Sequence, residues 1–184
     1  MIANLASQQA RLNCEMPLVM MTDDRAADWV DAARRLPTGS VVVVRARDKA
    51  KRRLLAGQLD GITRLLIADD PGLAAEIGAA GLHLPERRMC EASHWRARFP
   101  HWIITSAAHS LRALMGAGQL DAVFLSPVFA TSSHREAHPL TPARAAFIAA
   151  LSPVPVYALG GVTARNAARL APAFSGIAGI GLFL

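Results

Sequence analysis

Short apolar runs alternate with stretches of helical periodicity along most of the chain, and this alternation restricts the fold more than any other feature. The four valines at 41–44 are typical of a strand that is buried on both faces. Segments such as 29–36 place apolar side chains along one stripe, as an amphipathic helix does. Strict alternation favours a parallel sheet with right-handed crossovers. The pattern predicts seven helices between eight strands at 18–23, 41–44, 64–70, 81–84, 102–108, 122–128, 155–161 and 176–184.

Eight strands of this kind favour an α/β fold, a closed (β/α)8 TIM barrel. A doubly wound open sheet is the alternative, because 184 residues fall short of the roughly 250 that are usual for the barrel. The pattern lacks a last helix, which accounts for part of the difference. We expect a single domain over residues 1–184, in which residues 1–16 form an extra N-terminal segment.

The composition of the chain narrows its possible functions. Hydrophobic residues make up 52% of the chain and charged residues 18%, which excludes a disordered protein. The net charge of +6 favours anionic ligands, while an aromatic content of 5% offers no stacking platform for nucleic acid. The two cysteines lack zinc-type spacing. Without a signal peptide or a membrane-length apolar run, we expect a cytoplasmic protein that binds neither nucleic acid nor membrane.

In a barrel of this kind the ligand site lies where the strands end. The strongest signal there is ALGGVTARN, in which Gly160 and Gly161 separate a strand from a helix that Thr163 is expected to cap. Glycines let backbone N–H groups approach an anion, and a helix N-terminus adds its dipole, so the segment predicts a phosphate site. Gly181 in the last strand fits the same pocket wall. A tight turn that merely requires glycine is the structural alternative.

Further polar residues follow other strands and are candidate ligands. The loop after the sixth strand contains Thr131, Ser133 and His134, whose hydroxyl and imidazole groups suit a phosphate or diphosphate. A solvated surface loop would have the same composition. Arg45 and Arg47 alternate along the end of the second strand, so both side chains are expected at the barrel mouth.

Carboxylates and histidines complete the set of candidates. Asp69 at the end of the third strand is a candidate Mg²⁺ ligand, whereas Asp70 is expected to cap the next helix. His109, just past the fifth strand, is a candidate for proton transfer near neutral pH. We interpret His83 as a core or rim histidine, and the basic residues at 49–53 as the solvated face of a helix.

Six segments occur together in a fixed order: LVMMTDDR, VVRARD, LLIADDPGLAAEIGAAGLHLPE, ARFPHWIITSAAHSL, DAVFLSPVFATSSH and PVYALGGVTARNAARL. With them the chain resembles the thiamine monophosphate synthase/TenI superfamily from about residue 18 to its end. The resemblance implies a (β/α)8 barrel that binds a phosphorylated thiazole at its mouth. Synthases of this superfamily join hydroxymethylpyrimidine diphosphate to thiazole phosphate, and Mg²⁺ assists the loss of diphosphate. TenI-type members isomerise a thiazole carboxylate phosphate to its aromatic tautomer through a histidine.

Several positions depart from the synthase pattern. Val43 and Arg47 stand where synthases carry the Gln and the Lys of a Gln-x-Arg-x-Lys motif. Ala68 replaces the Asn that precedes Asp69, and Arg88 replaces a second Mg²⁺-binding Asp. Further departures are Ala107 in place of a serine and His134 in place of a diphosphate-binding lysine.

The resemblance therefore leaves three readings of the function. We favour a TenI-like thiazole tautomerase that needs no cofactor, in which His109 moves the proton and Arg45 or Arg47 holds the carboxylate. The alternatives are a thiamine phosphate synthase with Mg²⁺ at Asp69 and a non-catalytic phosphate-binding or regulatory relative. A homodimer is expected if a second copy covers the surface that the absent helix exposes. The expected substrate- or phosphate-binding residues are Arg45, Arg47, Thr131, Ser133, His134, Gly160, Gly161 and Gly181.

Overall fold

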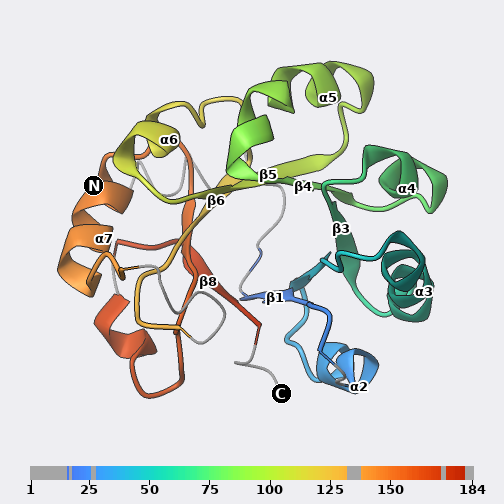
Figure 1. The fold of residues 1–184 in the computed structure, drawn as a ribbon, viewed down its shortest axis with the longest axis horizontal. Helices are drawn as coiled ribbons and strands as arrows, with labels where there is room; N and C mark the ends of the chain where they lie inside the picture. The colour runs from blue at the N-terminus through green and yellow to red at the C-terminus, as the bar shows by residue number, and fades with distance from the viewer. Residues whose placement is uncertain (1–15, 17, 26–27, 132–137, 171–172, 181–184) are drawn as a thin grey trace.

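Eight parallel strands form a closed barrel in which each strand pairs with the next in the sequence and β8 pairs with β1 (Figure 1). The structure is a computed structural model that describes residues 16, 18–25, 28–131, 138–170 and 173–180. The closed order confirms the predicted barrel and excludes the open sheet. The strands are β1 (Leu18–Met21), β2 (Val41–Val44), β3 (Arg64–Ala68), β4 (Gly81–Leu84), β5 (Ile103–Ala108), β6 (Ala122–Leu125), β7 (Val156–Ala158) and β8 (Gly176–Gly179).

Helices connect consecutive strands and lie around the outside of the barrel (Figure 1). Asp70, Ser110 and Thr141 accept a hydrogen bond from a backbone N–H in the first turn of the helix that follows each of them, as their positions in the sequence predict. In the described part of the chain, no helix is long and apolar enough to cross a membrane. The helices are α2 (Trp29–Arg34), α3 (Lys49–Leu59), α4 (Pro71–Glu76), α5 (Ala92–Arg98), α6 (Leu111–Met115), α7 (Pro142–Ala150) and two 3-10 helices, Glu86–Glu91 and Ala167–Leu170.

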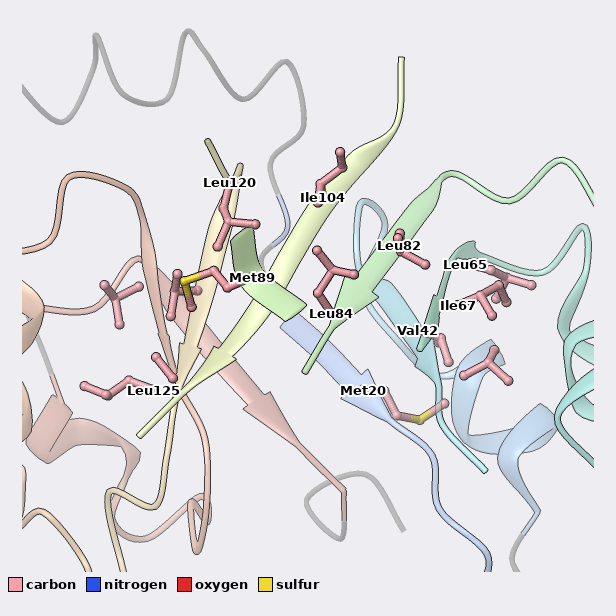
Figure 2. Close-up of a cluster of buried hydrophobic side chains, with 14 of the residues drawn as sticks. Met20, Val42, Leu65, Ile67, Leu82, Leu84, Met89, Ile104, Leu120 and Leu125 are labelled. Atoms are coloured by element: carbon pink, nitrogen blue, oxygen red, sulfur yellow. The ribbon is translucent and has the colours of Figure 1, made fainter. Parts of the chain in front are cut away.

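Alternate residues of the strands belong to two separate apolar clusters, one outside and one inside the barrel. On β2, Val42 and Val44 face the helices, whereas Val41 and Val43 belong to the cluster inside the barrel. Figure 2 shows members of the outer cluster, among them Met20, which project from successive strands. All four β2 valines are completely buried, which confirms the strand buried on both faces.

The interior of the barrel is filled by side chains at its centre and closed at the end where the strands begin. Phe124 on β6 stacks on the His83 ring at 4.9 Å and meets the edge of Tyr157 at 5.8 Å. The Tyr157 hydroxyl donates a hydrogen bond of 2.9 Å to the Met16 carbonyl, and burial raises the pKa of this phenol to about 12. Met16 itself is 2% exposed. Polar groups therefore gather at the opposite end, where the strands finish.

The expected homodimer remains a prediction. The surface of the barrel does carry large exposed apolar side chains. They include Leu111 and Met115 on α6, and Phe147 on α7 with Leu151 directly after it.

Candidate functional site at the barrel mouth

The described candidate residues all follow the carboxyl end of a strand. Ser133, His134 and Gly181 lie outside the described residues. Those that the structure places at the mouth are Arg45 and Arg47 after β2, Asp69 after β3, His109 after β5, Thr131 after β6, and Gly160 and Gly161 after β7.

The glycine pair after β7 is required by its backbone geometry. Gly160 and Gly161 have φ angles of +89° and +65°, a region that side chains with a Cβ rarely adopt. A Cβ on Gly160 would lie 2.8 Å from the Cα of Pro127, and one on Gly161 would overlap the carbonyl oxygen of Ala130. The pair is thus pressed against the loop that leads to Thr131, so both segments form one wall of the mouth.

A tight turn therefore explains why glycine is required at both positions. The turn also leaves backbone N–H groups that could bind an anion. Among the described residues, none accepts a hydrogen bond from the N–H groups of Gly161 and Val162. Successive backbone donors of this kind beside a polar mouth are suitable partners for phosphate oxygens.

The helix predicted after the glycine pair is wrong in extent. Among the described residues, none donates a hydrogen bond to the Thr163 hydroxyl as a capped helix would, and the Thr163 N–H donates to Asn166 Oδ1 at 2.8 Å. The Asn166 side chain also donates to the Gly161 carbonyl at 2.9 Å, and a single 3-10 helix of four residues follows. This short element contributes little dipole, so backbone N–H groups rather than a helix terminus are the available donors here.

His109 lies between the ends of β5 and β6. Its Nδ1 is 2.9 Å from the carbonyl oxygen of Ser126 and 3.2 Å from the Ser126 hydroxyl. A carbonyl only accepts hydrogen bonds, so Nδ1 is the donor in this contact, and among the described residues Nε2 has no hydrogen-bond partner. The backbone N–H of His109 donates to Glu86 at 2.7 Å, which fixes the position of the turn. The ring is therefore oriented with Nε2 available.

The other half of the mouth, from β1 to β4, contains a cleft of about 930 Å³, which we call the arginine cleft. Its charged lining consists of five arginines and three aspartates, so cationic groups outnumber carboxylates by two. Ile180, directly after β8, also lines it, so the cleft reaches the strand beside the glycine pair. The charged residues of the lining are Asp23, Asp24, Arg25, Arg45, Arg47, Arg52, Asp69 and Arg87.

We interpreted the basic residues of α3 as its solvated face, and for Arg52 this interpretation is wrong. Its side chain is only 11% exposed, and its guanidinium donates to the Ala46 carbonyl and contacts Asp70 at 3.3 Å. Arg87 and Arg25 were also missed. Arg87 follows the predicted end of β4 by three residues, and that position was the only signal in the sequence that pointed to it.

The surroundings of Asp69 do not fit a Mg²⁺ site. One carboxylate oxygen pairs with Arg87 at 2.8 Å, and the other pairs with Arg88. Arg88 is held in turn by both oxygens of Glu91, and these hydrogen bonds raise its pKa above the usual value. Within the described residues, no group of three or more His, Cys, Asp or Glu could hold a metal ion. Guanidinium groups occupy the carboxylate that the resemblance assigns to the metal.

His83 forms the floor of the arginine cleft. It is 5% exposed, and its Nδ1 is 2.9 Å from the Thr105 hydroxyl. Burial, together with the positive charge of Arg45, lowers the pKa of His83 to about 3. The imidazole is therefore neutral at physiological pH, which confirms a core or rim histidine that is not a proton carrier near pH 7.

This neutral histidine predicts a dependence of stability on pH. The unfolded chain takes up a proton on His83 below about pH 6.5, whereas the folded chain does so only near pH 3, so stability falls as the pH is lowered through this window. Between pH 7 and pH 5 the expected loss from this group is about 2 kcal/mol. Urea unfolding of wild type and His83→Gln at the two pH values measures it. An equal pH dependence in the two proteins would exclude the contribution.

The fold and the position of the polar groups define a (β/α)8 barrel whose ligand site lies at the carboxyl ends of the strands. The model of the family described as thiamine monophosphate synthase matches residues 17–183. The chain belongs to this family, as its resemblance to the superfamily implies.

Curated relatives agree with this membership. The chain is 34% identical over 160 residues to a protein of Aquifex aeolicus named "Putative thiamine-phosphate synthase 2", covering 78% of this chain and 82% of that protein. It is 31% identical over 166 residues to the thiamine-phosphate synthase of Methanoculleus marisnigri, covering 82% and 79%. The barrel is therefore one of thiamine biosynthesis.

Solved structures support the fold alone. The thiamine phosphate pyrophosphorylase of Pyrococcus furiosus superposes with a TM-score of 0.69 at 22% identity, covering 92% of this chain and 87% of that one. A 2-keto-3-deoxy-6-phospho-gluconate aldolase of Zymomonas mobilis superposes with a TM-score of 0.60 at 12% identity, covering 92% and 84%. Because such barrels host different chemistries, function has to be argued from the site.

Proposed function

We propose that this chain is a thiamine phosphate synthase, which joins a pyrimidine diphosphate to a phosphorylated thiazole. This is the first alternative of the sequence analysis, and it now takes precedence over the tautomerase. The observation that carries it is the arginine cleft of β1–β4, which adjoins the glycine pair of β7 across β8. A condensation needs room for a second substrate and its diphosphate, and a cleft of about 930 Å³ lined by five arginines exceeds what the single carboxylate of a thiazole carboxylate phosphate requires. The names of the relatives support the same choice.

The two halves of the mouth have separate tasks in this reaction. The N–H groups of Gly161 and Val162, which have no acceptor among the described residues, hold the phosphate of the thiazole, with Thr131 beside them. In the reaction, the C–O bond between the pyrimidine methylene carbon and the diphosphate breaks, and the electron pair leaves with the diphosphate. The thiazole nitrogen then donates its lone pair to the methylene carbon, which forms the C–N bond of the thiazolium product.

In this proposal Arg45 and Arg47 assist the loss of the leaving group. Among the described residues, their guanidinium groups have no hydrogen-bond or ion-pair partner. Fixed cations at the point where negative charge develops stabilise the transition state, because no reorganisation is needed as the bond breaks.

The direct test supplies both substrates to the purified protein and follows thiamine phosphate by chromatography. We expect product and diphosphate in equal amounts, with neither formed when one substrate is left out. Binding of thiazole phosphate without any product would contradict the synthase activity and would favour the non-catalytic phosphate-binding relative.

The tautomerase remains a second candidate because of the geometry of His109. A ring with Nδ1 bonded to a carbonyl and Nε2 free is suited to take a proton from a thiazole ring carbon and return it to the exocyclic carbon. If this reaction occurs, His109→Asn lowers its rate by about 10²–10⁴, the usual contribution of a general base, and leaves phosphate binding intact. NMR of the non-aromatic thiazole carboxylate phosphate measures the conversion. Unchanged conversion in His109→Asn would remove the role of His109.

A further inference from the structure

Asp69 lies in a network of ion pairs at the edge of the cleft. This network decides whether a metal ion or the protein's own cations would offset the negative charge of a bound diphosphate. Asp69 lies at φ +56°, a conformation unusual for a residue other than glycine, and its carboxylate is held by Arg87 and Arg88. Arg88 is locked in place by two further bonds, of 2.6 Å and 2.7 Å, to Glu91. Asp69 is thus oriented and neutralised by this chain's own cations, which leaves it unavailable as a bridge between a metal ion and an anion.

The positive charge that faces the cleft lies on a few specific side chains. Arg25 is paired with Asp23 at 2.7 Å, and Arg52 contacts Asp70 at 3.3 Å. These pairs leave Arg45 and Arg47 as the cations of the lining that lack a carboxylate partner in the described residues. Arg87 shares Asp69 with Arg88, and Arg88 also pairs with Glu91, so these four side chains together carry no net charge. Arg45 and Arg47 are therefore the lining cations whose charge no described carboxylate offsets.

Guanidinium groups match phosphate oxygens geometrically as well as in charge. Each presents several N–H donors in a planar fork, which forms paired hydrogen bonds to a phosphate group. A diphosphate spans several ångströms and offers oxygens to more than one arginine at once, and the cleft of about 930 Å³ has ample room for it.

We propose that the cleft of β1–β4 binds the diphosphate group of the substrate without a divalent metal ion, through Arg45, Arg47 and Arg87, while Arg88 fills the place of the metal at Asp69. This inference rests on the proposed synthase for the identity of the substrate. It goes beyond that function by assigning the leaving group to a named set of arginines and by making its binding independent of Mg²⁺.

Calorimetric titration with inorganic pyrophosphate tests the site without any turnover. In EDTA we expect wild type to bind pyrophosphate, and Mg²⁺ to leave the affinity unchanged or to weaken it by competing for the ligand. Arg45→Gln and Arg47→Gln are each expected to lower the affinity by about tenfold, as the loss of one charge-assisted contact does. Binding that requires Mg²⁺, or that neither variant weakens, would overturn the proposal.

Arg53→Gln is the matched control, because it removes an arginine a few residues further along the chain that does not line the cleft. Arg53 is exposed on α3 and pairs with Glu76. Its replacement is expected to leave pyrophosphate binding within about twofold of wild type. An equal loss in Arg53→Gln and Arg45→Gln would show that net charge rather than the cleft attracts the ligand, which overturns the site.

Arg88→Asp tests the substitution of the metal. It places a second carboxylate beside Asp69, so binding in EDTA is expected to fall by about tenfold or more and to become stimulated by Mg²⁺. Binding in EDTA that stays at the wild-type level would contradict the role of Arg88. If the variant does not fold, the wild-type titration in EDTA and in Mg²⁺ still decides metal independence.

The two proposals fail in different ways. Pyrophosphate binding in EDTA, with no thiamine phosphate formed from both substrates, would end the proposed function and leave the diphosphate site standing. Product that forms only in Mg²⁺, together with pyrophosphate binding only in Mg²⁺, would end the metal-independent site and leave the synthase standing.

Discussion

Replacement of Phe124 by alanine is expected to destabilise the barrel by about 3–5 kcal/mol, as for other phenylalanines removed from packed cores. Phe124 is completely buried on β6 and contacts rings from β4 and β7. The resulting cavity would lie inside a closed cylinder of strands, where no helix can move in to fill it. Urea unfolding at pH 7, followed by circular dichroism, measures the loss.

The control is the same substitution on the surface. Phe147 on α7 is 65% exposed, so Phe147→Ala is expected to change the free energy of unfolding by no more than about 0.5 kcal/mol. Similar losses in the two variants would contradict the assignment of Phe124 to the centre of the barrel.

Gly161→Ala is expected to destabilise the protein by about 2–4 kcal/mol and to weaken the binding of thiazole phosphate. Two costs add at this position. The φ of +65° is strained for alanine, and the new methyl group would overlap the Ala130 carbonyl. Relief of that overlap moves the loop that carries Thr131 away from the glycine pair, so the wall proposed for the phosphate is lost. Thermal unfolding and calorimetry on the same preparation measure both effects.

Gly57→Ala is a control for which the expected change in stability has the opposite sign. It lies inside α3 and a Cβ there would meet no heavy atom within 4 Å. Gly57→Ala is expected to stabilise the protein by about 0.5–1 kcal/mol, because alanine loses less conformational freedom in a helix. A Gly161→Ala protein as stable as wild type would show that the wall does not require glycine.

Features that depend on local sequence were predicted well. The strands follow from short apolar runs, and the caps at Asp70, Ser110 and Thr141 depend only on residues within one turn. The helix after Thr163 failed for a local reason that the pattern does not display. The Asn166 side chain turns back to bond Thr163 and Gly161, and the turn that begins at Thr163 continues in the described residues only as a short 3-10 helix.

The cleft could not be predicted because its contacts join distant parts of the chain. Asp69 meets Arg87 and Arg88 across 18 and 19 residues, and Arg52 meets Asp70 across 18. The hydrophobic periodicity of a sequence does not indicate ion pairs between residues so far apart. Without them, the departures from the synthase motif looked like lost chemistry, and they favoured the tautomerase. The geometry instead supports a cationic subsite to which two of these positions, Arg47 and Arg88, contribute.

The central claim is that the mouth holds two different anions at the same time, a phosphorylated thiazole at β6–β8 and a diphosphate at β1–β4. Titration of thiazole phosphate into protein already saturated with pyrophosphate, in EDTA, tests it most directly. The account predicts that saturating pyrophosphate changes the dissociation constant of thiazole phosphate by less than about threefold. A dissociation constant that rises in proportion to the pyrophosphate concentration would mean that the two ligands compete for one site, and would contradict the account.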